Sequence, residues 1–114
     1  GKSYLWPQVS PDGTKILYFV VGEGCFVCNI DGSNSVPQGM LRASVWYDNN
    51  IIVGMNHKDN GHVTTSSKLI AKEINSNTTQ ELTTSSVKAM YPSAGAKSIS
   101  FVTPEGELYV LNIK

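Results

Sequence analysis

The densest group of metal-binding side-chain types lies in one short polar segment. His57, Asp59 and His62 fall within six residues of one another, and imidazole and carboxylate groups are common ligands of zinc and other transition metals. The residues around them are mainly Asn, Lys and Gly, which is typical of a solvated loop tip. We therefore expect an exposed loop here and treat these three residues as weak metal candidates.

The two cysteines, Cys25 and Cys28, lie three residues apart in a strand-like run. Residues i and i+3 of an extended strand point to opposite faces, so these thiols are poorly placed to bridge each other or to share a metal. A structural zinc site needs four ligands, and the sequence has no second cysteine pair. We predict that both thiols are buried and unreactive.

The sequence shows no motif for nucleophilic catalysis or phosphate binding. It lacks the Gly-x-Ser-x-Gly nucleophile elbow and a glycine-rich phosphate loop. The acidic residues Asp12, Asp31, Asp48 and Glu105 all fall at predicted turns, where the needs of the backbone alone account for them. We therefore predict no catalytic residues and no cofactor.

The charge balance argues against two classes of partner. The chain has 114 residues, with 9 basic and 9 acidic side chains and no run of like charges. This disfavours binding to nucleic acid or to an anionic membrane surface. No apolar stretch approaches the roughly 18 residues that a membrane-spanning helix needs.

Hydrophobic periodicity predicts strands along the whole chain. Apolar residues alternate with a period of two in several windows, and no window keeps a helical spacing between credible caps. Residues 16–21 form a continuous apolar run, which is typical of a strand covered on both faces. Turns are predicted at residues 11–13, 22–24, 31–32 and 105–106 from their Pro, Asp and Gly content. We expect about ten to twelve short strands in three groups, and no helix.

A motif near the N-terminus returns twice in degraded form. The first copy passes from Trp6-Pro7 through a Ser-Pro-Asp-Gly turn into a strand, and the last copy begins with Tyr91-Pro92. The middle copy starts with Val45-Trp46-Tyr47. Self-similarity at a period of a few tens of residues is the signature of stacked or radially arranged units. The strands that open the copies begin at Ile16, Ile51 and Ile99, which are 35 and 48 residues apart.

The first copy resembles the WD40-like propeller repeat of TolB-type proteins and of dipeptidyl peptidase IV-type propeller domains. The residues that carry the resemblance are Trp6-Pro7-Gln8-Val9-Ser10-Pro11-Asp12-Gly13-Thr14-Lys15-Ile16-Leu17-Tyr18 and Val27-Cys28-Asn29-Ile30-Asp31-Gly32. The last copy shortens the turn, and the middle copy replaces it with Asp48-Asn49-Asn50. The resemblance implies an all-β fold of about three four-stranded antiparallel blades, with approximate boundaries at 1–38, 39–84 and 85–114.

Three blades are too few for a closed propeller, which has about four to eight. Open blades leave unpaired edges and apolar faces, which natural proteins avoid. The chain is then either a segment of a propeller of six to eight blades or one half of a homodimer that closes a propeller. A small β-sandwich is the third alternative.

The resemblance also implies a non-catalytic, TolB-like binding scaffold for a protein or peptide, in the periplasm or outside the cell. The aromatic residues Trp6, Trp46, Tyr47 and Tyr91 recur at one place in each copy and are expected either to pack between blades or to line one mouth of the propeller. Tyr4, Arg42 and Lys88 lie just before these positions and extend the candidate binding surface. The alternatives are a propeller segment of an enzyme, either a prolyl oligopeptidase-type peptidase or a metal-dependent sugar lyase, and a module that contacts carbohydrate.

Overall fold

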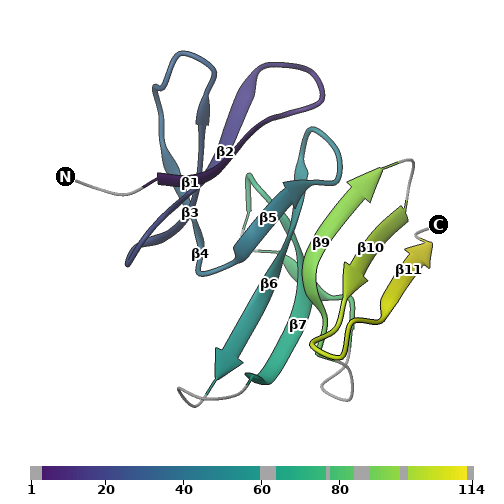
Figure 1. Ribbon diagram of the computed structural model, residues 1–114. Helices are drawn as coiled ribbons and strands as arrows, with labels where there is room; N and C mark the ends of the chain where they lie inside the picture. The colour runs from purple at the N-terminus through teal and green to yellow at the C-terminus, as the bar shows by residue number, and fades with distance from the viewer. Residues whose placement is uncertain (1–3, 60–63, 77, 84–87, 96–97, 113–114) are drawn as a thin grey trace.

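The fold consists of antiparallel strands joined by short turns (Figure 1). The computed structural model describes residues 4–59, 64–76, 78–83, 88–95 and 98–112. Within these ranges it contains eleven strands and no helix, which confirms the predicted all-β class. The strands are β1 (Tyr4–Val9), β2 (Lys15–Val20), β3 (Gly24–Asn29), β4 (Val36–Gly39), β5 (Arg42–Trp46), β6 (Ile51–Asp59), β7 (Thr64–Glu73), β8 (Thr79–Glu81), β9 (Met90–Gly95), β10 (Ser98–Val102) and β11 (Leu108–Asn112).

The strands form three sheets in which neighbours along the chain are neighbours in the sheet. Sheet 1 has the order β1-β2-β3-β4, sheet 2 the order β5-β6-β7-β8 and sheet 3 the order β9-β10-β11. All pairings are antiparallel. The approximate boundaries expected from the sequence after residues 38 and 84 remain a prediction.

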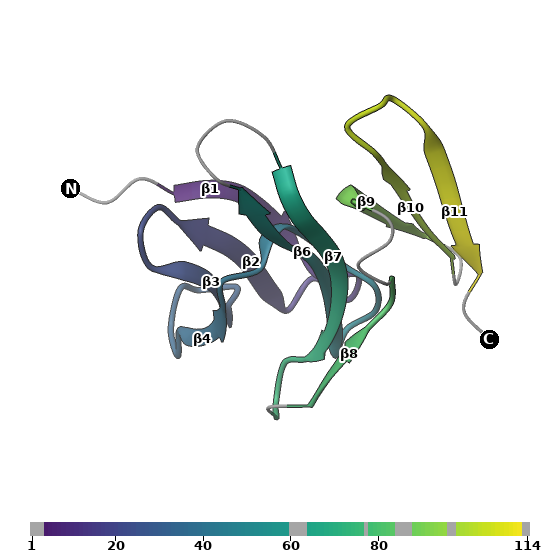
Figure 2. The same cartoon turned by 90° about the horizontal axis from the view of Figure 1, so that it is seen from below.

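The sheets pack face to face, with sheet 2 between the other two (Figure 2). Strand β5 lies against β1, β2 and β3, while β9 lies against β5, β6 and β7. One apolar cluster fills each junction. The cluster between sheets 1 and 2 contains Leu17, Phe19, Cys25, Val27, Leu41, Trp46, Ile52 and Ile74. The cluster between sheets 2 and 3 contains Val53, Met55, Leu69, Ala89, Ile99 and Phe101.

Alternation along β6 explains how one sheet serves two clusters. Successive residues of a strand point to opposite faces, so Ile52 faces sheet 1 while Val53 faces sheet 3. Their exposed fractions are 0% and 1%. Residues 16–21 also read as a doubly covered strand, but Ile16 and Tyr18 on β2 are only half-buried because sheet 1 has a packed neighbour on one face.

The first strand of each sheet carries a β-bulge at the same register position. Residues 6 and 7 oppose Tyr18, residues 43 and 44 oppose Gly54, and residues 91 and 92 oppose Phe101. In sheet 2 the chain comes very close to the central strand here: a Cβ atom on Gly54 would lie 2.7 Å from the Leu41 Cβ. Gly54 is therefore required where the other two sheets have an aromatic residue.

Two local predictions have different outcomes. The turn at Pro11-Asp12-Gly13 is confirmed, with the Gly13 amide donating to the Ser10 carbonyl at 2.9 Å and a Gly13 φ of 74°. The polar segment 56–67, in contrast, is not simply a loop. Residues 56–59 continue β6 and residues 64–67 belong to β7, because the hairpin ladder extends past the packed part of the sheet. A polar composition does not by itself indicate irregular backbone here.

Candidate protein-binding edge

The predicted binding residues divide between two opposite edges of the molecule. We define the strand-start edge as the edge at which β1, β5 and β9 begin. Arg42 is the first residue of β5, Tyr91 is the second residue of β9, and Lys88 precedes that strand. Trp46 ends β5 and lies about 13 Å from Arg42 at roughly 3.3 Å per residue. Tyr47 follows Trp46 directly. The structure therefore brings Arg42, Lys88 and Tyr91 to one edge and excludes Trp46 and Tyr47 from it.

Trp46 has a packing role that its position explains. Only 7% of its surface is exposed, and its indole Nε1 donates to the Gln8 carbonyl at 3.0 Å, which ties sheet 2 to sheet 1. Tyr47 is half-buried and packs against the second apolar cluster. The expectation that the four aromatic residues occupy one equivalent place is thus wrong for Trp46 and Tyr47.

The bulges identify the true equivalents. Tyr91 occupies the first bulge position of sheet 3, as Trp6 does in sheet 1, and both precede Pro. The equivalent residue of sheet 2 is Ala43, three residues before Trp46. Trp6 lies on β1, but its side chain is outside the described part of the structure. The middle copy has therefore replaced the aromatic residue of the bulge with alanine.

Strand pairings and close contacts show that residues at the strand-start edge form one continuous row. Tyr4 pairs with Val20, which pairs with Gly24. A Cβ atom on Gly24 would lie 2.9 Å from the Met40 sulfur, so Met40 covers this end of sheet 1. Arg42 follows two residues later and pairs with Met55.

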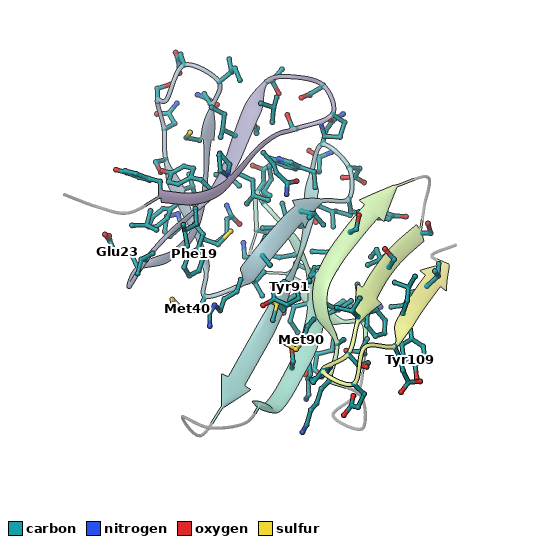
Figure 3. The ribbon with its side chains drawn as sticks, viewed as in Figure 1. Phe19, Glu23, Met40, Met90, Tyr91 and Tyr109 are labelled. Carbon is teal, nitrogen blue, oxygen red and sulfur yellow. The ribbon has the colours of Figure 1, made fainter. Side chains whose placement is uncertain are left out.

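The row continues to sheet 3 through a contact of the Met55 sulfur. This sulfur accepts a hydrogen bond from the Tyr91 amide at 3.3 Å. Figure 3 shows Met40 below the β2–β3 side of sheet 1 and Tyr91 at the start of β9. The row runs from β1 to β9 and touches all three sheets.

The side chains of this row are large and exposed. The exposed fractions are 62% for Tyr4, 61% for Met40 and 59% for Tyr91, and Arg42 is also exposed. Tyr, Met and Arg are the residue types enriched in protein–protein interfaces, and Tyr and Arg dominate their hot spots. Met40 was missed in the sequence, although an apolar residue directly after Gly39 in a predicted connection signals a side chain without a strand to bury it.

The backbone at Tyr91 aims its side chain outward. Its φ of 52° lies in the left-handed region, which non-glycine residues rarely adopt. Bulges of this kind bend a strand and redirect a side chain, and they are over-represented beside functional sites. Ala43 has a φ of 49° at the equivalent position.

Buried reactive groups elsewhere serve the fold. Burial is the main cause that raises the pKa of the Cys25 thiol to about 11, and Cys28 is buried as well, which confirms the prediction of buried cysteines. Both are free thiols. With its pKa raised, the Cys25 thiol stays protonated near neutral pH and is a poor nucleophile.

Lys72 is a buried lysine with a complete set of acceptors. Its Nζ donates to the Gln38 Oε1 at 2.5 Å, to the Ser76 carbonyl at 2.9 Å and to the Glu73 carbonyl at 3.3 Å. Because an ammonium has three protons, all its donors are used. Burial lowers the pKa of Lys72. Lys72 thereby joins β4 of sheet 1 to β7 of sheet 2.

A hollow of about 380 Å³ opens beside Lys72, where sheets 1 and 2 meet. This volume lies within the usual range for small-molecule sites, about 300–1,000 Å³. The polar groups that line it are largely used inside the protein, as the Lys72 bonds show. Its lining residues are Val36, Pro37, Lys72, Ile74, Asn75 and Ser76.

The weak metal candidates lie outside the part of the chain whose side chains are described. The backbones of His57 and Asp59 belong to β6, while His62 is outside the described residues. Among the described residues, no three His, Cys, Asp or Glu side chains gather as a metal site would require. No helix in the described ranges has the length and apolar character needed to cross a membrane.

None of the protein-family models matches this chain. A search of the curated proteins also finds no match.

Proposed function

We propose that this chain is a set of propeller-type blades that acts as a non-catalytic scaffold and binds a protein or peptide at the strand-start edge. The observation that carries the proposal is the row of exposed Tyr4, Met40, Arg42 and Tyr91 across three sheets. The two tyrosines of the row have few rotatable bonds and lose little rotamer freedom on binding, and together with Met40 they offer apolar surface that binding removes from water.

The sheet arrangement supports the propeller part of the proposal. Consecutive antiparallel meanders of three or four strands pack face to face, and each first strand has its bulge at the same register position. A propeller also consists of radially repeated sheets, typically of four strands. A rigid stack of this kind holds side chains from three sheets in a fixed arrangement, as a binding scaffold requires.

The structural roles of the titratable groups support the proposal that the scaffold is non-catalytic. Lys72 has all three protons in hydrogen bonds, and Cys25 is a protonated thiol within the first apolar cluster. Asp12 and Asp31 accept hydrogen bonds from their own turns. These groups contribute to folding, and the exposed row contributes to recognition.

A peptide-display experiment tests the proposal. A library of random peptides is selected on the wild-type chain, and the affinities of the enriched peptides are measured for two variants. Met40→Ala with Tyr91→Ala removes two anchors of the row, so we expect a loss of about tenfold or more. Ile30→Ala is the matched control, because Ile30 is 52% exposed and lies at the opposite edge.

The result that overturns this proposal is equally definite. Peptides whose affinity falls with Ile30→Ala and not with the double variant would locate recognition at the edge opposite the strand-start edge. A failure to enrich any peptide would also count against a peptide-binding scaffold.

A further inference from the structure

The molecule builds one kind of interface twice. Each time, one sheet presents one face, which we call face Y, to the opposite face of the next sheet, which we call face X. Register equivalence defines these faces, because the residues of β2, β6 and β10 that oppose the bulges correspond to one another. Face Y of sheet 1 contains Leu17, Phe19, Cys25 and Val27, and face Y of sheet 2 contains Val53, Met55, Leu69 and Ala71.

Face X follows the same rule. In sheet 2 it includes Trp46, Ile52 and Ile70, all of which pack in or against the first cluster. In sheet 3 the corresponding residues pack in or against the second cluster or on one another. These residues are Ala94, Ile99, Phe101, Leu111 and Tyr109, and the Tyr109 ring stacks on the Phe101 ring.

Sheet 1 has a face X that no sheet in the described part of the chain covers. Its residues are Val9, Ile16, Tyr18, Phe26 and Cys28, by the same register equivalence. Val9 is 55% exposed and Ile16, Tyr18 and Phe26 are half-buried, while Cys28 at the end of β3 is buried. The Tyr18 and Phe26 rings stack at 5.7 Å and 15°, nearly as the Phe101 and Tyr109 rings do at 5.4 Å and 18°. The uncovered face thus has the geometry of a face that is packed elsewhere in the molecule.

Sheet 3 has the complementary uncovered face Y. Its residues are Ser100, Val102, Leu108 and Val110, which correspond to Leu17, Phe19, Cys25 and Val27. Leu108 is 69% exposed and Val110 is 58% exposed, although their equivalents in sheet 1 are 1% and 5% exposed.

Neither uncovered face carries a charged residue at the positions named above. Apolar, uncharged patches of this kind on a protein surface mark sites of association. A strand whose residues are apolar on both faces is also typical of a sheet that is covered on both sides. Both properties indicate that a further sheet covers each outer face.

We propose that the occupant is a second copy of this chain, in head-to-tail association. Face Y of sheet 3 in one copy packs on face X of sheet 1 in the other, and the reciprocal contact forms between the remaining two faces. Each copy already contains both halves of this interface, so the second copy continues the packing that joins sheets 1, 2 and 3. A head-to-tail contact that closes forms a ring and leaves no apolar face open.

The solution mass tests the proposal, measured by light scattering after size exclusion across a wide dilution series. We expect a mass of twice 12.4 kDa that falls toward 12.4 kDa on dilution. Val9→Asp on face X and Val110→Asp on face Y each place a charge in both contacts of a pair, so each variant alone should be monomeric. Both positions are more than half exposed, so we expect both variants to fold, as circular dichroism checks.

Mixing the two variants separates head-to-tail pairing from other arrangements. The Val9→Asp copy retains face Y and the Val110→Asp copy retains face X, so a mixed pair has one unmodified contact and should recover dimerisation. Ile30→Asp is the control and should leave the mass unchanged, because Ile30 lies in a turn outside both faces.

Three outcomes would overturn the proposal. A monomeric wild type at all concentrations would assign these faces to a partner other than a second copy. A Val110→Asp variant that remains dimeric would indicate pairing of face X with itself, and a mixture that stays monomeric would exclude the reciprocal contact. Tyr4 of the binding row lies beside face X, with its ring centroid 5.8 Å from that of Tyr18. None of these substitutions changes Tyr4, Met40, Arg42 or Tyr91, so failure here is distinguishable from failure of the proposed function.

Discussion

Sheet 2 and its two neighbours have the same strand order but differ in how they are covered. Sheet 2 is covered on both faces, and Ile52 on one face and Val53 on the other are essentially without exposure. Sheets 1 and 3 are each covered on one face. The equivalent of Ile52 in sheet 1 is Ile16, which is only half-buried.

This difference teaches that side-chain type alone does not determine burial in this chain. Ile occurs at the same position in all three sheets, as Ile16, Ile52 and Ile99, yet two are completely buried and one is not. The position is apolar in sheet 1 although no sheet among the described residues packs over it. The contribution of an isoleucine at this position to the free energy of unfolding therefore depends on what packs on the sheet.

The largest expected effect comes from truncating the covered isoleucine. Ile52→Ala should reduce the free energy of unfolding by about 2–5 kcal/mol, because it removes buried methyl groups and leaves a cavity. Ile16→Ala should cost less than half as much in the monomer, since solvent already reaches this side chain. Urea unfolding followed by the fluorescence of the buried Trp46 measures both.

Ile99→Ala is the control for this comparison, because it is as buried as Ile52 but lies in the outer sheet 3. It should resemble Ile52→Ala, since the covered face determines the cost. Measurements belong on the monomeric Val110→Asp background so that association does not contribute. Equal costs at Ile16 and Ile52 on this background would contradict the difference in coverage.

A smaller effect is expected where sheet 2 departs from its neighbours in polarity. Lys72 occupies the position of Cys28 in sheet 1 and Leu111 in sheet 3. Lys72→Met should cost about 1–3 kcal/mol, because the Gln38 Oε1 loses its donor inside the protein. Lys72→Met combined with Gln38→Leu should recover part of this loss, since the orphaned acceptor is removed as well.

The pH dependence of this pair has a definite sign. Burial lowers the pKa of Lys72 below its ordinary 10.5, so the folded protein releases this proton before the unfolded chain does. The cost of burying the charge is fully present below the folded pKa and is relieved as the pH rises toward 10.5. The wild type should therefore gain stability relative to Lys72→Met in the alkaline range, and a relative loss there would contradict the assignment.

Local features of this fold could be predicted from the sequence, because neighbouring residues largely determine them. The Pro11-Asp12-Gly13 turn is one case, since the Asp12 carboxylate accepts its hydrogen bonds from Ser10 and Thr14, while the Asp12 amide donates to the Asn49 Oδ1 at 2.8 Å. The all-β class followed from alternation over many residues.

Features that depend on register could not be predicted in this way. Strand pairing makes Ala43 the equivalent of Trp6, whereas sequence similarity had aligned Trp46, three residues later, with Trp6. The burial of Lys72 depends on Gln38, which is 34 residues away. Met40 lies in a connection whose exposure depends on how Gly24 and Gly39 approach each other. Distant pairings of this kind leave no local signal.

The smallest expected effect distinguishes the turns of sheet 1 from its faces. Hydrogen bonds from Ser33 hold the pKa of Asp31 below its ordinary 3.8, and hydrogen bonds from Thr14 and Ser10 do the same for Asp12. Because these folded-state pKa values are depressed, their contribution to stability is complete above pH 3.8 and is lost as the pH falls through the folded values.

Asp12→Asn should therefore lower the melting temperature slightly at neutral pH and flatten its decline under acid conditions, as scanning calorimetry would show. Thr14→Ala tests the cause, because it removes the strongest donor to Asp12 while the carboxylate remains. A wild-type acid sensitivity retained in full by both variants would mean that the acid response resides in other groups. Because both aspartates are exposed, burial contributes little here. The turns of sheet 1 differ from its faces in being stabilised by hydrogen bonds, most of them local and one of them from the Asp12 amide to the Asn49 Oδ1 of sheet 2.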